Sequence, residues 1–249
     1  MRPDASKKLA AAAPKKGPNP VIIGAVVAAV VIVGVVVAIL LGSSGKSGTG
    51  SAGAGGSGQP ADVIGGAAGG IFANAATAKS NAPTLDLYED FQCPSCALLE
   101  KQIGAQKASL AKAGEIKLVV HTLSFLDDNL KNDSSARSAN AAACAADAGK
   151  FLEYRAAVFA AQPAEEGVGY TDAQLTQFAG TAGITGAALT TWQQCTSSGQ
   201  YNRYVTDVQE ESGRAGVNST PTIKLNGKDV TKDVQTPEAL VAAVRAATK

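Results

Sequence analysis

The chain has 249 residues and a nearly balanced charge, with 22 Lys and Arg against 21 Asp and Glu and a formal net charge of +1. Residues 84–249 carry 15 basic and 19 acidic side chains, which gives this part a net charge of −4. A nucleic-acid-binding protein needs a concentrated basic face, so the composition argues against that class.

The N-terminal part of the chain is typical of a membrane anchor. Residues 1–20 form a basic leader with Arg2 and four lysines against the single Asp4. Residues 21–41 contain no charged side chain, and a helix of that length spans about 30 Å, the hydrocarbon thickness of a bilayer. By the positive-inside rule the leader is cytoplasmic and the rest of the chain extracytoplasmic. A cleaved signal peptide is the alternative, but its apolar region measures only about 7 to 15 residues.

A flexible linker and the first strands are expected next. Residues 42–70 are rich in Gly, Ser and Ala, and such a segment cannot bury enough apolar surface to offset its chain entropy. The folded domain is therefore expected at residues 71–249, beginning with a short edge strand at residues 71–73. Residues 85–91 alternate apolar and polar side chains and predict the following strand.

Two cysteines, Cys93 and Cys96, follow this strand at the predicted start of a helix. Unpaired backbone N–H groups and the helix dipole favour an anion there, so Cys93 should ionise readily and act as an exposed nucleophile. Cys96 lies three residues further on the same helical face, close enough for a reversible disulfide. Pro94 suits the first helical position, where a backbone N–H would be unpaired.

A zinc site is the competing interpretation of these cysteines. It requires four ligands, such as a second CxxC pair or two histidines. The chain has four cysteines, no second CxxC and one histidine, His121. We therefore expect no metal and no bound cofactor, with the reversible disulfide itself as the redox group.

The helix is expected to end near Gly114, and residues 116–123 form an apolar run rich in β-forming side chains. Strand, helix and strand make a βαβ unit, whose strands are parallel and joined by a right-handed crossover. His121 lies in the second strand and is interpreted as structural.

Residues 128–216 show helical patterns without a strand signal. Residues 134–162 predict an alanine-rich helix that ends before a proline. A capping box at residues 171–174 opens another helix. Residues 186–211 predict one long helix or two abutting ones, with Trp192 in the core.

Two further cysteines, Cys144 and Cys195, lie in this helical region. Because Cys93 and Cys96 are spaced to pair with each other, Cys144 and Cys195 are the natural second pair. They lie beyond the membrane segment, where disulfides persist. We predict a structural disulfide between two helices. Two separate buried thiols are the alternative.

The C-terminal end predicts a hairpin and a final helix. Residues 222–225 and 229–231 flank Asn226 and Gly227, which tolerate the positive φ of a tight turn. Thr236 then caps the last helix.

Two sequence blocks resemble those of a known family. Residues 88–96 resemble the YEDFQCPxC signature of DsbA-like thioredoxin-fold proteins, in particular the membrane-anchored type of Gram-positive bacteria. Residues 216–228 resemble the family block GvxgTPTfxxNGk. The resemblance covers about residues 70–249. It implies an α/β thioredoxin-like fold with an inserted all-helical subdomain at about residues 128–216, preceded here by the single transmembrane helix and the flexible linker.

The resemblance also implies the site residues. Cys93 and Cys96 would be the catalytic pair, and Thr220 and Pro221 the opposite wall of the site. A cis bond before Pro221 would expose the Thr220 backbone to an extended substrate and bring its side chain near Cys93.

Two departures from the family pattern concern the chemistry. The dipeptide between the cysteines is Pro94-Ser95, where DsbA has Pro-His, so the nucleophile should be less acidic and the disulfide less oxidising than in DsbA. Leu87 occupies the position of the buried aspartate that assists proton transfer in thioredoxin. Glu89 or Asp90 is a candidate for that work through water, with a surface carboxylate or a strand-end cap as the alternative.

The sequence as a whole predicts an extracytoplasmic thiol:disulfide oxidoreductase that forms disulfides in secreted proteins. Its partners would be reduced secreted substrates and, as the family implies, a membrane reoxidising partner such as a quinone-linked oxidoreductase. A membrane-tethered reductase or isomerase and a non-catalytic thioredoxin-fold binding module are the alternatives.

Overall fold

The computed structural model describes residues 58–248. The predicted leader, the membrane segment at residues 21–41 and the linker up to residue 57 lie outside the described residues. Within the described range, no helix is both long and apolar enough to cross a membrane.

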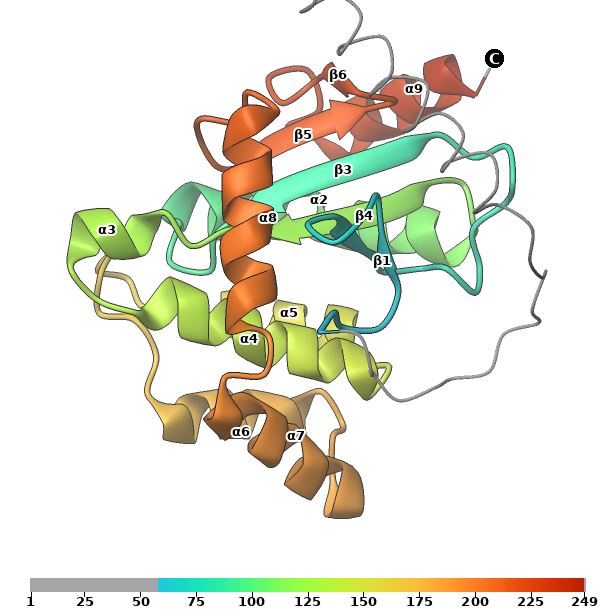
Figure 1. Cartoon of the computed structure of the whole chain (residues 1–249). Coiled ribbons are helices and arrows are strands. Elements are labelled where there is room, and N and C mark those ends of the chain that lie inside the picture. Colours follow the sequence, from blue (N-terminus) through green and yellow to red (C-terminus); the bar gives the residue numbers. More distant parts are fainter. Residues whose placement is uncertain (1–57, 249) are drawn as a thin grey trace, which may run out of the picture. The chain divides into compact units, whose positions relative to one another are not determined.

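A mixed sheet of six strands forms the centre of the domain, in the order β1-β2-β4-β3-β5-β6 (Figure 1). The strands are β1 (Val63–Ile64), β2 (Gly70–Phe72), β3 (Thr84–Glu89), β4 (Lys117–Thr122), β5 (Thr222–Leu225) and β6 (Lys228–Asp229). β3 and β4 are parallel, as the predicted βαβ unit requires, and β5 runs antiparallel to β3. The redox cysteines follow β3, so this central strand positions them.

The start of the folded domain differs from the prediction. The sequence predicts a linker as far as residue 70, but β1 pairs with β2 within that stretch, and β2 is therefore not an edge strand. Gly65 and Gly66 have φ values of 87° and 95°, which let the chain reverse between the two strands. A glycine-rich composition indicated flexibility here, whereas these glycines form a turn.

Helices cover both faces of the sheet. They are α2 (Pro94–Lys112), α3 (Leu126–Leu130), α4 (Ser134–Asp147), α5 (Phe151–Ala160), α6 (Asp172–Thr181), α7 (Gly186–Ser198), α8 (Asn202–Arg214) and α9 (Pro237–Ala247). α2 packs against α9 behind the sheet, and α8 crosses its front (Figure 1). α3 to α8 all lie between β4 and β5, where the sequence predicts the helical insertion.

Two predicted helices are divided. The helix predicted at residues 134–162 breaks after α4, where Gly149 takes a φ of 64° that a helix interior does not allow. The stretch at residues 186–211 forms two helices, α7 and α8, and Gly199 ends the first in a left-handed conformation.

Local signals elsewhere match the structure. Thr171 and Gln174 form the reciprocal capping box at the start of α6. The Thr236 hydroxyl accepts a hydrogen bond from the backbone N–H of Ala239 and caps α9. Asn226 has a φ of 49° in the turn between β5 and β6.

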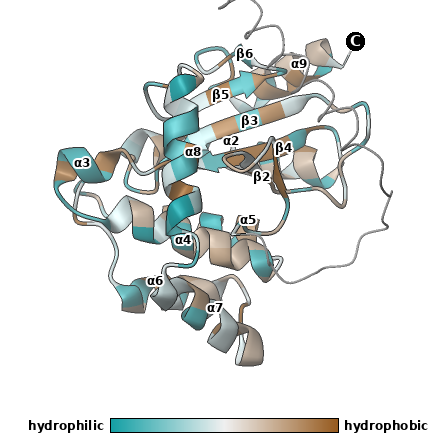
Figure 2. Cartoon of the chain, in the orientation of Figure 1, coloured by the Kyte–Doolittle hydropathy of each residue, from teal (hydrophilic) through white to brown (hydrophobic). Residues whose placement is uncertain are grey.

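The core lies between the sheet and the inner faces of the helices. Figure 2 shows α8 as largely hydrophilic, and its buried side chains include Tyr204, Val205 and Val208. A disulfide joins Cys144 in α4 to Cys195 in α7, the pairing expected from the sequence.

Candidate active site

Cys93 is the N-cap residue of α2, and Cys96 lies in the first turn of that helix. The Cys93 Sγ atom accepts a hydrogen bond from the backbone N–H of Cys96 at 3.4 Å. Pro94 follows the cap in the first turn, where its missing N–H has no cost. Both cysteines are free thiols, so the structure shows the pair in its reduced state.

The Thr220–Pro221 loop forms the wall opposite Cys93. The peptide bond between these residues is cis, as expected. The Thr220 carbonyl oxygen lies 3.4 Å from the Cys93 Sγ atom. This loop covers the thiol more than the sequence indicated, because only 6% of Cys93 is exposed, against 2% of Cys96.

The two thiols differ sharply in acidity. The hydrogen bond from the Cys96 thiol, assisted by the backbone N–H groups of Ser95 and Cys96, lowers the pKa of Cys93 to about 6 although burial opposes the shift. Burial and the interaction with Cys93 raise the pKa of Cys96 well above its usual value. Cys93 is therefore the thiolate near neutral pH, and Cys96 keeps its proton.

Glu89 is buried, with only 1% of its surface exposed. The alternative that it is a surface carboxylate is therefore wrong. Arg155 from α5 binds it in a bidentate manner, with Nε to Oε1 and Nη2 to Oε2 both at 2.5 Å. Because the guanidinium occupies both carboxylate oxygens, Glu89 serves as an ion-pair partner rather than as a free base.

The ion pair extends into a buried cluster of two acids and two bases. Arg155 Nη1 also lies 2.8 Å from Glu100 Oε2, and Lys107 Nζ lies 2.6 Å from the same oxygen. Burial alone would raise the pKa of Glu100, but Arg155 and Lys107 lower it to about 2. The cluster is thus a set of ion pairs that ties the redox helix α2, which carries Glu100 and Lys107, to Arg155 of α5 and Glu89 of β3.

Asp90 is fully buried and acts as a cap at the end of β3. Its Oδ1 atom accepts hydrogen bonds from the backbone N–H of Gln92 at 2.9 Å and from the Ser135 hydroxyl at 2.6 Å. Burial raises the pKa of Asp90 to about 7, although these donors and the N–H of Leu126 lower it. Of the roles considered for Asp90, these hydrogen bonds support that of a cap at the end of β3.

The comparisons with known proteins agree with this geometry. A family model described as thioredoxin matches residues 76–246. The reduced disulfide bond oxidoreductase DsbG of Mycobacterium tuberculosis is 30% identical, with a TM-score of 0.57, and the match covers 68% of this chain and 85% of that one. The chain belongs to the thioredoxin family.

Other solved structures place it among enzymes of the DsbA type. Reduced DsbA of Mycobacterium tuberculosis is 28% identical, with a TM-score of 0.57, and the match covers 68% of this chain and 89% of that one. MdbA of Actinomyces oris shares the fold at 23% identity and a TM-score of 0.64, covering 76% of this chain and 92% of that one. None of the curated proteins matches the chain. The chain is a DsbA-like protein thiol–disulfide oxidoreductase.

Several residues around the site of this DsbA-like enzyme could not be found by sequence reasoning. Four side chains of the helical insertion contact the end of β3 or the turn before Cys93, namely those of Ser135, Arg155, Gln162 and Tyr170. No local motif marks them, because their partners lie 45 to 79 positions away in the chain.

Leu87 and His121 take no part in the thiol chemistry of the site. Leu87, at the position of the thioredoxin aspartate, is a buried core residue of β3. The His121 ring stacks on Tyr88 with ring centroids 4.2 Å apart, and its Nε2 atom lies 3.1 Å from Asp86 Oδ1. These contacts hold β3 and β4 together, consistent with a structural histidine.

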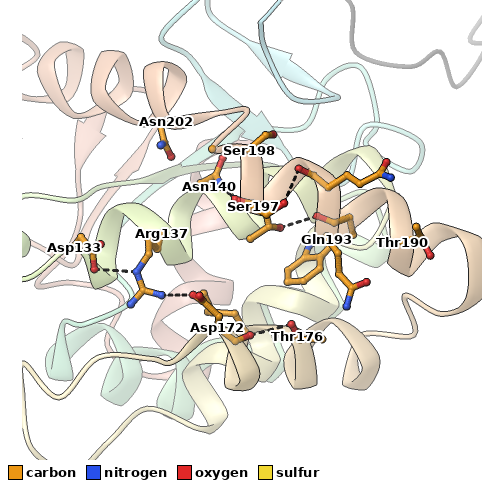
Figure 3. Close-up of a pocket in the computed structure, with 15 residues that line it drawn as sticks. Asp133, Arg137, Asn140, Asp172, Thr176, Thr190, Gln193, Ser197, Ser198 and Asn202 are labelled. Carbon is orange, nitrogen blue, oxygen red and sulfur yellow. Dashed lines mark hydrogen bonds and ion pairs between the residues drawn. The ribbon is translucent and has the colours of Figure 1, made fainter.

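A separate groove of about 640 Å³ lies in the helical insertion (Figure 3). Arg137 in this groove binds Asp133 at 2.9 Å and Asp172 at 2.7 Å. Its lining includes neither redox cysteine, so the redox chemistry lies elsewhere.

Proposed function

We propose that this enzyme is an extracytoplasmic thiol oxidase that forms disulfides in secreted proteins through Cys93 and Cys96. The observation that carries the proposal is the position of Cys93 at the N-cap of α2, where its Sγ atom accepts the backbone N–H of Cys96 at 3.4 Å beside the cis Thr220–Pro221 loop. This environment lowers the pKa of Cys93 to about 6, while burial raises that of Cys96. A stabilised Cys93 thiolate favours the reduced form of the enzyme, and its disulfide is correspondingly a stronger oxidant.

The exchange begins from the oxidised enzyme. A substrate thiolate attacks Cys93 Sγ, a new substrate–Cys93 disulfide forms, and Cys96 leaves as a thiolate that takes up a proton. A second substrate thiolate then attacks the substrate sulfur of the mixed disulfide, and Cys93 leaves as the thiolate. The substrate has lost two electrons to form its disulfide, and the enzyme dithiol holds them.

The loop opposite Cys93 supports the binding of a protein substrate. The carbonyl of Thr220, before the cis Pro221, lies beside Cys93, where an extended substrate can pair with this backbone.

Residues 21–41 would anchor the domain in the membrane, with residues 1–20 in the cytoplasm. A membrane partner such as a quinone-linked oxidoreductase would reoxidise the dithiol.

Trapping in cells tests the proposal. A Cys96→Ala variant lacks the thiol that can attack Cys93 Sγ and release the substrate again, so mixed disulfides between Cys93 and secreted proteins should accumulate as covalent complexes that disappear on reduction. Alkylation of wild-type cells should find the pair mostly oxidised. The purified pair should have a reduction potential closer to about −120 mV than to the thioredoxin value of about −270 mV.

Three results would contradict it. A mostly reduced pair with a potential near about −270 mV would indicate a reductase or isomerase. Full cellular function of a Cys93→Ala variant would indicate a non-catalytic binding module. Trapped complexes that contain only cytoplasmic proteins would contradict the extracytoplasmic location.

A further inference from the structure

The helical insertion holds the short segment of residues 90–93 that leads into the redox helix. The Ser135 hydroxyl from α4 donates to the Asp90 carboxylate at 2.6 Å. The side-chain amide of Gln92 donates to Asp127 Oδ1 at 2.9 Å. The segment is therefore fixed by side chains of the insertion as well as by the end of β3.

Gln162 supplies the contact nearest to the nucleophile. Its Nε2 atom lies 3.0 Å from the carbonyl oxygen of Cys93 and 2.8 Å from that of Phe91. Gln162 follows the end of α5, and Pro163 after it cannot donate a backbone hydrogen bond to continue the helix. Its amide thus bridges the two ends of the turn before α2.

The two bridged carbonyl groups do not depend on Gln162 equally. The Phe91 oxygen also accepts a hydrogen bond from the Tyr170 hydroxyl at 3.0 Å. The Cys93 oxygen otherwise accepts only the first helical bonds, from Cys96 N at 3.1 Å and Ala97 N at 3.3 Å. Loss of the amide would therefore leave the Cys93 oxygen with its helical bonds but without the one side-chain donor that it has among the described residues.

We propose that Gln162 is a positioning residue through which the helical insertion keeps Cys93 reactive. The proposal rests on the proposed function, in which Cys93 is the nucleophile. The amide N–H groups place partial positive charge beside the N-cap peptide and fix its orientation. That orientation aligns the Cys93 sulfur with the donors that stabilise its thiolate, the Cys96 N–H and the Cys96 thiol.

The test compares three variants of the reduced full-length chain. Gln162→Met keeps the length of the side chain but removes its donors, and Gln162→Glu replaces the amide by a carboxylate. Gln177→Met alters an exposed glutamine of α6 and is the matched control. The rate of iodoacetamide alkylation at Cys93 is measured from pH 4 to 9 by mass spectrometry, together with the reduction potential and the melting temperature.

Gln162→Met removes both hydrogen bonds and should slow alkylation of Cys93 at pH 6 by about three- to tenfold, the effect expected from losing the one to the Cys93 oxygen. Gln162→Glu should slow it further, because a carboxylate beside the N-cap peptide opposes thiolate formation. Both variants should shift the pH midpoint of alkylation upward and make the potential more negative. Gln177→Met should stay within about twofold of wild type.

An unchanged pH profile and potential in Gln162→Met would overturn the role of Gln162, even if the melting temperature falls, since that is the result of a purely structural contact. If Gln162→Glu fails to fold, Gln162→Met decides alone. Wild-type Cys93 that alkylates like an ordinary thiol would instead overturn the proposed function, so the two failures are distinguishable.

Discussion

At the scale of single residues, the redox site depends on the unequal acidity of two thiols one helical turn apart. The helix start alone predicts an acidic Cys93, but the largest contribution comes from the hydrogen bond of the Cys96 thiol, which the structure supplies. Because Ser95 offers no imidazolium, the Cys96 thiol is the main side-chain donor to the Cys93 sulfur. The two cysteines should be regarded as one coupled group.

A Cys96→Ala variant tests this coupling. Without the Cys96 thiol, the pKa of Cys93 should rise from about 6 towards the ordinary thiol value. Thiolate absorbance at 240 nm should then show a midpoint at higher pH than in reduced wild type. A Ser95→Ala variant is the control, since it leaves the backbone N–H groups and the Cys96 thiol in place; an unchanged midpoint in Cys96→Ala would contradict the assignment.

The buried carboxyl group of Asp90 makes a second prediction, on stability against pH. Its folded pKa of about 7 lies above the unfolded value near 3.9, so the folded state binds more protons between these values. Stability should therefore fall as pH rises from about 4 to about 7, by at most about 4 kcal/mol from this group.

Urea unfolding of Asp90→Asn and wild type at pH 5 and pH 8 measures this effect. The variant keeps an oxygen that can accept from Gln92 and Ser135 but cannot ionise, so its stability relative to wild type should improve at pH 8. Asp128→Asn, at an exposed position of α3, is the control. A difference between Asp90→Asn and wild type that is the same at both pH values would contradict the raised pKa.

At the scale of elements, the buried ion-pair cluster joins α5 to β3 and α2. Arg155→Met would leave Glu89 buried without its partner, which typically costs about 3 to 5 kcal/mol. Thermal or urea unfolding measures the loss. Arg203→Met removes an exposed pair with Asp207 on α8 and should cost less than about 1 kcal/mol; equal losses in the two variants would contradict the importance of burial.

At the scale of the whole molecule, the disulfide between Cys144 and Cys195 and the redox pair should act independently. The disulfide links positions 51 residues apart, so its removal should destabilise the fold by up to about 4 kcal/mol in the chain-entropy model. Unfolding of a Cys144→Ala/Cys195→Ala variant measures this loss. The alkylation profile of Cys93 should remain that of wild type, and a changed profile would indicate that the second disulfide takes part in the exchange.

The sequence by itself determined the features that depend on neighbours in the chain. Cys93 at a helix start, the capping box at Thr171, the turn at Asn226 and the parallel strands around α2 follow from local chemistry or from the pattern of a few residues. The family resemblance added the Thr220–Pro221 wall. These signals are short-range, so they survive without knowledge of the packing.

Only the tertiary structure decided which distant side chains surround the site. It showed that Arg155 forms an ion pair with Glu89 and that Asp90 is buried against Ser135 of α4. It also showed that the Gln162 amide donates a hydrogen bond to the carbonyl oxygen of Cys93. It also placed the first strand inside the segment expected to be a linker. These contacts join residues far apart in the chain, and whether a polar side chain finds a buried partner or solvent is fixed by how the helices pack, which local patterns do not encode.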